Sequence, residues 1–319
     1  MDPIQELRAS AREALPELDI FIGWEQGFDP LHATPAFIKD SQDMEGLIWN
    51  PLCVQNLAGY LPWLKDKKVG ICVKGCDSRS VVQLLQEGLL KRENLTIFGL
   101  NCSGVLDLKK IQAQVPDAGN IQEVRFNGEQ VEIFTLRETY RLQKQELLPL
   151  KCQACMYPNP VLADHTFGQE AQPANPDQGQ YFDLEEFEGK SLQERLEYWQ
   201  YHLERCIRCY ACRNACPLCV CRDQCIAQTR NPHWLSEENN IQQNLMYQMI
   251  HAQHLAGRCT GCGECERVCP MDIPVLALKR KLSQIVQELF DYEAGLDQNA
   301  VPPLLTFQTE EKNMEPRGE

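Results

Sequence analysis

Two runs of cysteine have the residue type and spacing with the most specific chemistry in this chain. The first is Cys206, Cys209, Cys212 and Cys216 before Pro217, and the second is Cys259, Cys262, Cys265 and Cys269 before Pro270. Both have the spacing C-x2-C-x2-C-x3-C-P, in which three thiolates on one tight turn face three irons of a 4Fe-4S cubane. The fourth cysteine of each run is carried away by a helical turn and ligates the other cluster.

The spacing therefore predicts two 4Fe-4S clusters that exchange their fourth ligands. Cluster one takes Cys206, Cys209, Cys212 and Cys269, and cluster two takes Cys259, Cys262, Cys265 and Cys216. A pair of zinc sites is the alternative, but zinc is usually bound by two separated C-x2-C pairs and not by a triple with a trailing C-P. His251 and His254 lie between the runs and are expected to be ordinary surface or interface residues, because the cysteines already complete both cubanes.

Two further cysteines follow strand-like runs of the first 150 residues. Cys76 comes after a strand that ends near Lys74, and Cys102 comes after the next strand. If these strands are parallel neighbours, both thiols emerge at the sheet edge where ligands gather. With the C-x2-C pair Cys152 and Cys155 they form a four-thiolate set for cluster three. Taken singly, a cysteine is most often a small buried hydrophobe, and residues 75–79 also suit an anion-binding helix N-terminus.

Five of the seventeen cysteines then remain. Cys72 lies inside an apolar strand and is expected to be buried without function. The other four would hold a cluster four, although their C-x-C-x3-C spacing is unusual: Cys53, Cys219, Cys221 and Cys225. A rival assignment joins Cys152 and Cys155 with Cys221 and Cys225, and the sequence fits it equally well. The ligands of a third and a fourth cluster therefore stay open.

The elements that must position these cysteines follow two patterns. Strand-like runs alternate with helical patterns in the first part, which predicts an α/β domain with a partly parallel sheet over residues 1–150. The strands are expected at 18–24, 68–73 and 95–100, and the helices at 52–64, 80–90 and 105–115. The pair Asn127-Gly128 lies between two further strand-like runs, at 122–126 and 130–136, and predicts a hairpin turn.

The later part of the chain has a helical pattern. After Pro232, Ser236 is a candidate N-cap for a helix that ends at Gly257 and returns the chain so that the second run faces the first. Apolar residues between 276 and 289 predict another amphipathic helix. We expect a connecting segment with the C-x2-C pair at 151–200, a mainly α-helical dicluster ferredoxin-like domain at 201–290, and a docking or disordered tail at 291–319.

Charge and composition narrow the functional classes. The net charge of -14 over 319 residues argues against nucleic acid as a partner, since phosphate binding needs a basic surface. The first 15 residues do not read as an export signal, and no apolar run approaches the roughly 20 residues of a membrane span. We therefore expect a soluble cytoplasmic protein whose locally clustered cysteines bind metal and do not form disulfides.

Arginines gather around the first cysteine run in this acidic chain. Residues 201–230 contain five arginines, at positions 205, 208, 213, 222 and 230, against two acids, Glu204 and Asp223. Positive charge stabilises an anionic four-thiolate cubane and raises its potential. The same group would also steer an acidic partner if it is exposed, although a solvated surface face is the plainer interpretation.

The N-terminal cysteines also carry a family resemblance. Over roughly residues 64–168, the chain resembles the beta subunits of deazaflavin (coenzyme F420)-reducing hydrogenases and formate dehydrogenases. The matching features are Lys74-Gly75-Cys76, residues 99–104, Cys152-x2-Cys155, Ala163-Asp164 and Gly168. In that family the corresponding cysteines are associated with a 4Fe-4S cluster that exchanges electrons with a flavin. With the dicluster module, the whole chain is similar to beta subunits that accompany heterodisulfide-reductase-type complexes and formate dehydrogenases in anaerobes.

The resemblance implies an electron-transfer subunit of an anaerobic redox complex that relays single electrons between clusters and a flavin-bearing partner. The alternative is a beta subunit that itself binds FAD and exchanges hydride with deazaflavin or NAD(P). The chain lacks the glycine-rich N-terminal segment of the family's flavin-binding members, and Gly23 to Gly27 does not replace it. No acid-base pair or nucleophile stands out for chemistry on a substrate, so we expect no catalytic residue.

Overall fold

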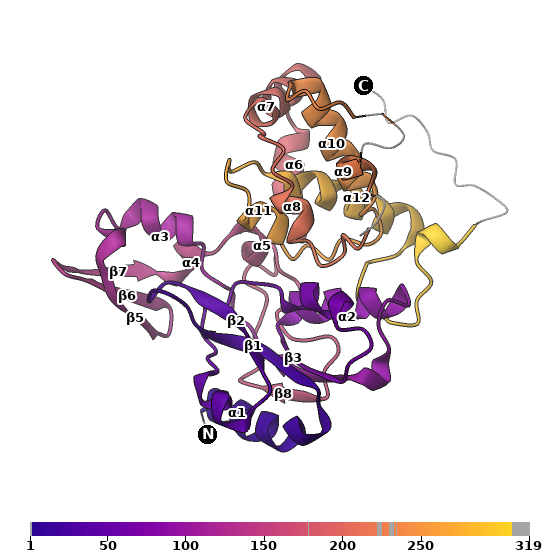
Figure 1. The fold of residues 1–319 in the computed structure, drawn as a ribbon. Helices are drawn as coiled ribbons and strands as arrows, with labels where there is room; N and C mark the ends of the chain where they lie inside the picture. The colour runs from indigo at the N-terminus through magenta and orange to yellow at the C-terminus, as the bar shows by residue number, and fades with distance from the viewer. Residues whose placement is uncertain (1, 178, 222–224, 230–232, 234, 308–319) are drawn as a thin grey trace.

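The structure is a computed structural model, and it describes residues 2–177, 179–221, 225–229, 233 and 235–307. Figure 1 shows an α/β part below and a helical part above, with the helix α2 (Gly75–Gln86) between them. In the described residues, no helix is both long and apolar enough to cross a membrane. The predicted combination of an α/β domain and a helical dicluster region is confirmed.

A five-stranded sheet forms the centre of the α/β part. Its order is β2-β1-β3-β4-β8, and every neighbouring pair is parallel except the antiparallel pair of β1 and β2. All five residues of β3 are buried, as expected of a parallel strand that is covered on both faces. The strands are β1 (Ile20–Gln26), β2 (Ala33–Ile38), β3 (Val69–Val73), β4 (Leu95–Leu100) and β8 (His165–Phe167).

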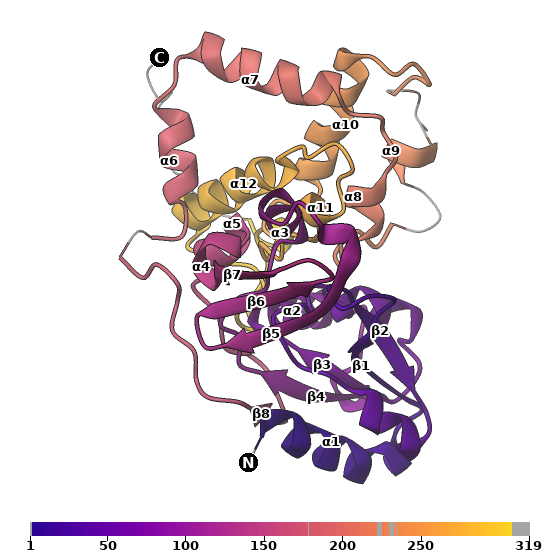
Figure 2. The same ribbon diagram turned by 90° about the vertical axis from the view of Figure 1, so that its left-hand side faces the viewer.

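Helices cover both sides of this sheet. Figures 1 and 2 place α1 (Pro3–Ala14) below the sheet and α2 above it, toward the helical part. The helix predicted at 52–64 is instead a shorter 3-10 helix, η3 (Leu57–Trp63), with Pro62 near its end. The other two predictions hold with shifted ends, in α2 and in α3 (Leu108–Gln114), which begins at the N-cap Asp107.

A second, three-stranded sheet follows α3 and short 3-10 turns. Its strands β5 (Ile121–Asn127) and β6 (Gln130–Thr135) form the predicted hairpin, in which Asn127 pairs with Gln130 and Gly128 has a φ of +63°. Sequence analysis did not predict the third strand, β7 (Thr139–Gln143). Two short helices then lead to the C-x2-C pair: α4 (Lys144–Leu147) and α5 (Leu150–Gln153).

The helical part holds both ferredoxin-like cysteine runs. The helix predicted between them is α10 (Ile241–Gln253), but its N-cap is Asn240, whose side chain accepts from the backbone N–H of Gln243. The predicted N-cap Ser236 is therefore wrong; its hydroxyl accepts from Glu238 N at 3.3 Å in the preceding turn. The amphipathic helix predicted near the end is α12 (Val275–Phe290). The others are α6 (Phe182–Glu188), α7 (Leu192–Glu204), α8 (Ala211–Asn214), α9 (Ile226–Thr229) and α11 (Glu264–Arg267).

The segment after α12 returns to the α/β part and docks on α2. The guanidinium of Arg79 donates to Glu293 Oε1 at 2.8 Å and to Ala294 O at 2.7 Å, and Tyr292 is buried beside the same helix. In the segment predicted as a tail, contacts with α2 extend to Asp297 and Ala300, whose carbonyl oxygens accept from Gln86. The 3-10 turn Pro303–Leu305 follows, and residues 308–319 lie outside the described residues. The segment predicted as a connection at 151–200 contributes strand β8 to the main sheet.

Candidate iron-sulfur sites

The cysteines proposed for cluster three lie around one cavity of about 270 Å³ at the top of the main sheet. The parallel neighbours β3 and β4 deliver two of them to the same edge: Cys76 follows β3 in the first turn of α2, and Cys102 follows β4. The remaining two come from α5 and the residues after it, Cys152 and Cys155. The structure therefore brings all four side chains of this set to one site.

Two glycines allow the chain segments around this cavity to approach closely. A Cβ on Gly75 would lie 1.9 Å from the carbonyl oxygen of Tyr157. Gly104 has a φ of +98°, and a Cβ there would lie 2.7 Å from a methyl carbon of Leu148. The backbone N–H of Cys102 also donates to Pro158 O at 3.1 Å, which ties the loop after β4 to the segment that follows Cys155.

The charges around the cavity suit an anionic group. Burial raises the pKa of Cys102 to about 12 and also raises the pKa of Cys76. Two of the lining arginines have a buried Nε without a hydrogen-bond partner, Arg79 and Arg280. Four thiols with basic neighbours match the donor set and the charge of a 4Fe-4S site. The basic residues that line the cavity are Lys74, Arg79, Lys151 and Arg280.

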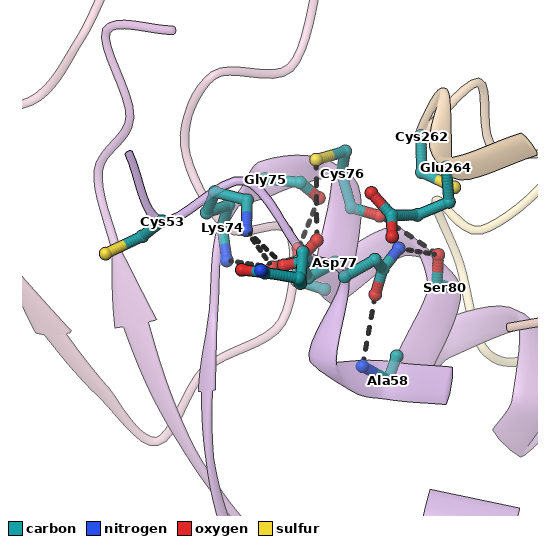
Figure 3. A network of polar contacts seen from close by, with 12 residues as sticks. Cys53, Ala58, Lys74, Gly75, Cys76, Asp77, Ser80, Cys262 and Glu264 are labelled. Atoms are coloured by element: carbon teal, nitrogen blue, oxygen red, sulfur yellow. Dashed lines mark hydrogen bonds and ion pairs between the residues drawn. The ribbon is translucent and has the colours of Figure 1, made fainter. Parts of the chain in front are cut away.

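Lys74 is the most deeply buried of these basic residues. Its ammonium contacts Asp77 Oδ2 at 2.8 Å, donates to Gln55 O at 2.8 Å and lies 4.2 Å from the ring centroid of Trp24. Burial lowers the pKa of Lys74, but the neighbouring carboxylate of Asp77 more than offsets this, so the lysine stays charged. Figure 3 shows this pair at the start of α2, with Cys262 and Glu264 of the helical part beside the same turn.

The four cysteines proposed for cluster one line a second, smaller cavity: Cys206, Cys209, Cys212 and Cys269. Cys269 belongs to the second run, so its place beside the first run agrees with crossed ligation. Two residues of the loop, Arg208 and Tyr210, have φ values of +47° and +60°, a conformation that is uncommon outside glycine. Cys209 is exposed whereas the other three are buried, which puts one side of this site at the surface.

The cysteines proposed for cluster two lie at the interface between the two parts. Cys216 of the first run raises the pKa of Cys259, Cys262 and Cys265, in each case after the larger effect of burial. The pKa of Cys262 reaches about 12 for this reason. Cys216 also forms a hydrogen bond with Cys219. The proximity of Cys216 to the second run is the reciprocal half of the crossed arrangement.

The cysteines proposed for cluster four lie in different parts of the molecule. Cys53 is buried in the core of the α/β part, where its thiol donates to Ile48 O at 3.8 Å, and in Figure 3 its sulfur points away from Cys76. The other three lie in the helical part: Cys219 beside Cys216, and Cys221 and Cys225 beside Arg213. Arg213 Nε donates to the sulfur of Cys225 at 3.2 Å. Contacts in the described residues therefore lend cluster four no support, and Cys72 is buried in β3 as expected.

A single-ion site is a poor match to these cysteines. One tetrahedral zinc ion, with Zn–S bonds of about 2.3 Å, needs its sulfurs within roughly 4 Å of one another. Among the residues that the structure describes, no group of three His, Cys, Asp or Glu side chains is arranged to hold a metal ion.

Three polar residues near these sites were missed or misjudged. His251, predicted as a surface or interface residue, is buried; it stacks on Tyr247, and within the described residues neither ring nitrogen has a hydrogen-bond partner. The sequence contained a signal for this burial, because His251 follows Tyr247 by four residues and so lies on the same face of α10. Lys279 is buried on α12, and the thiols of Cys265 and its neighbours raise its pKa against the effect of burial. Lys151 directly precedes Cys152 and donates to Cys262 O at 2.7 Å.

The predicted arginine group is only partly a free surface. Arg213 contacts cysteines, and Arg208 donates to the backbone oxygens of Ser236 and Glu237. Arg205 lies over the ring of Tyr201, with 4.7 Å between the guanidinium carbon and the ring centroid. Arg222 and Arg230 lie outside the described residues.

Comparison with known proteins identifies both parts of the chain. Residues 66–191 match the family model for the C terminus of the coenzyme F420 hydrogenase/dehydrogenase beta subunit, and residues 202–273 match the model of the 4Fe-4S dicluster domain. An F420-dependent formate dehydrogenase subunit beta of Methanocaldococcus jannaschii is 24% identical, with 91% of this chain and 90% of that protein aligned. The F420-dependent formate dehydrogenase 1 subunit beta of Methanococcus maripaludis is 23% identical, with 90% and 89% aligned.

A solved structure also matches part of the chain. It is a xenon-derivatised F420-reducing [NiFe] hydrogenase complex from Methanosarcina barkeri, with a TM-score of 0.37 and 18% identity over 47% of this chain and 58% of that chain. The family matches instead rest on the segments that contain the cysteine sets described above. Residues 66–191 are thus similar to the C terminus of coenzyme F420 hydrogenase/dehydrogenase beta subunits, and residues 202–273 are similar to 4Fe-4S dicluster domains.

Proposed function

We propose that this chain is an iron-sulfur electron-transfer subunit of a multi-subunit redox complex of the formate dehydrogenase or hydrogenase type. The observation that supports this most is the arrangement of three four-cysteine sets, which run from the sheet edge of the α/β part through the interface into the helical part. Curated relatives that align over nine-tenths of the chain are named as beta subunits of F420-dependent formate dehydrogenases.

The chain's own residues supply the ligands, the charge and the enclosure in this proposal. In this proposal Cys76, Cys102, Cys152 and Cys155 would hold cluster three, Cys259, Cys262, Cys265 and Cys216 would hold cluster two, and Cys206, Cys209, Cys212 and Cys269 would hold cluster one. Each bound 4Fe-4S cluster supplies reversible uptake of one electron. The buried lysines and arginines offset the negative charge of the thiolates, and the α2 interface keeps water from the second set.

Electrons enter and leave at the two ends of this series. At one end, Cys209 is exposed next to Ile207, whose side chain is also exposed, so this face is suited to a redox partner. At the other end, the cavity of the third set opens at the carboxyl edge of the sheet. A cubane accepts one electron at a time, whereas a hydride donor delivers two. A flavin or another two-electron centre must therefore connect the hydride donor to the clusters. We place that flavin on a partner subunit.

Anaerobic purification followed by iron, sulfide and flavin quantitation tests this function. We expect about 12 irons per chain, at four per cubane, and little flavin. The protein should be reduced by dithionite but should not oxidise formate or NADH without other subunits. Stoichiometric FAD together with unaided turnover of a hydride donor would replace this proposal with that of a flavin-containing oxidoreductase subunit.

A further inference from the structure

Two lysines of the α/β part reach into the helical part and donate to backbone carbonyls of the second cysteine run. Lys151 Nζ donates to Cys262 O at 2.7 Å, and Lys109 Nζ donates to Cys269 O at 3.1 Å. The two differ in their surroundings. Lys109 is exposed and forms an ion pair with Asp272. Lys151 is half-buried, and in the described part of the chain no carboxylate lies within 4 Å of its Nζ.

Lys151 lies at the junction between the second and the third cysteine sets. It directly precedes Cys152 in α5, and it lines the cavity that the third set surrounds. Its stem packs on Gly263, the residue after Cys262: a Cβ on Gly263 would lie 2.4 Å from Lys151 Cδ. The backbone of Lys151 thus lies at the third cysteine set, and its side chain reaches the second set.

The charge of this side chain faces both sets. Burial lowers the pKa of Lys151, but the thiols of Cys76 and Cys152, the carboxylate of Glu264 and the thiol of Cys262 together raise it by more. Lys74, a second cation on the same side, forms a direct ion pair with Asp77. Among the described residues Lys151 has no direct ion pair, and the nearby Glu264 is itself paired with Arg267.

We infer that Lys151 is a shared counter-charge that raises the reduction potentials of both cluster two and cluster three. A fixed positive charge stabilises the more negative, reduced form of a nearby cluster, and the effect is larger away from bulk water. The Lys151 ammonium contacts Cys262 O of the second set, and the same residue lines the cavity of the third set, so its charge would act on both clusters. This inference rests on the proposed function, because it requires a cluster in each set.

Redox titration of the full-length, anaerobically prepared protein tests the inference, with each cluster followed by its electron paramagnetic resonance signal. Lys151→Gln keeps a donor toward Cys262 O but removes the charge, and we expect it to lower the midpoint potentials of clusters two and three while leaving cluster one unchanged. Lys151→Arg keeps the charge and should leave all three potentials unchanged. Lys109→Gln is the matched control, since its charge is already paired with Asp272, and it should not move clusters two and three.

The results separate this inference from the proposed function. If the wild-type protein has all three clusters and Lys151→Gln moves neither potential or only one, the inference is wrong and the proposed function stands. If the wild-type protein lacks the third cluster, both fail. If Lys151→Gln does not assemble a cluster, the test rests on Lys151→Arg. Unchanged potentials in that variant support the inference, and a downward shift of both potentials despite the retained charge overturns it.

Discussion

A single methyl group placed at Gly75 should remove cluster three without touching any cysteine. The Cβ of an alanine at this position would lie 1.9 Å from Tyr157 O, 2.9 Å from Tyr157 C and 3.0 Å from Asn159 O. These are backbone atoms, so no flexible side chain can move aside. Since Cβ atoms do not approach heavy atoms closer than 3.0 Å, residues 157–159 must retreat from α2 by about 1.1 Å, the difference between 3.0 and 1.9 Å.

This displacement acts on both sides of the third set. Cys155 lies two residues before Tyr157, and the N–H of Cys102 donates to Pro158 O, so both thiols would move relative to Cys76. Ligand constellations tolerate errors of about 0.5 Å, and overpacking of this kind costs about 1–3 kcal/mol. We therefore expect Gly75→Ala to fold but to hold about 8 irons per chain in place of about 12, at four per cubane.

Iron and sulfide quantitation with spectra of the dithionite-reduced protein would measure this loss. The matched control is Gly119→Ala, where an added Cβ meets nothing within 4 Å; it should keep the wild-type iron content. A Gly75→Ala protein with full iron and an unchanged spectrum would refute the reasoning. Equal loss in both variants would show that the close contact at Gly75 is not the cause.

Three other predictions follow from the same contacts. Cys216→Ala should perturb the cluster of the second run more than that of its own run; a change confined to the cluster of Cys206 would contradict crossed ligation. Glu293→Gln leaves the buried Arg79 without its counter-charge and should lower the free energy of unfolding by about 3 kcal/mol or more in anaerobic denaturant titrations, whereas Glu123→Gln, in an exposed pair, should leave it unchanged. Burial, with Lys279 nearby, lowers the pKa of His251 in the folded protein from 6.5 to about 2. Between these two pH values only the unfolded chain binds the proton, so the free energy of unfolding falls as the pH decreases below about 6.5. His251→Leu should reduce that loss by about 1.4 kcal/mol per pH unit, and parallel pH profiles of the two proteins would show that His251 is not responsible.

Local signals in the sequence predicted the elements whose formation depends on their own residues. The apolar runs of β3 and β4, the Asn127-Gly128 turn and the periodicity of α12 each identified an element. The spacing of the two cysteine runs identified the dicluster domain, because most ligands of each cluster come from residues close together in the sequence.

Elements that depend on distant partners could not be predicted in this way. Strand β2 contains Pro35, which normally argues against a strand, but β2 lies at the edge of the sheet and tolerates it. Strand β8 is three residues long and forms because β4 offers it an open edge. Ser236 and Asn240 were both acceptable N-caps, and only the folded turn decides between them. The burial of His251 and the reach of Lys151 to Cys262 likewise require the packed interface.

The return of the C-terminal segment to α2 has a consequence for biosynthesis. Arg79 and its partner Glu293 are 214 residues apart, and chains fold from the N-terminus as they leave the ribosome. The residues of the α/β part are therefore synthesised long before Glu293 and Ala294. Until those two residues are made, Arg79 stays hydrated, and this arginine lines the cavity of the third cysteine set. We therefore expect Arg79, one wall residue of this cavity, to reach its final position only after the segment with Glu293 and Ala294 has been synthesised.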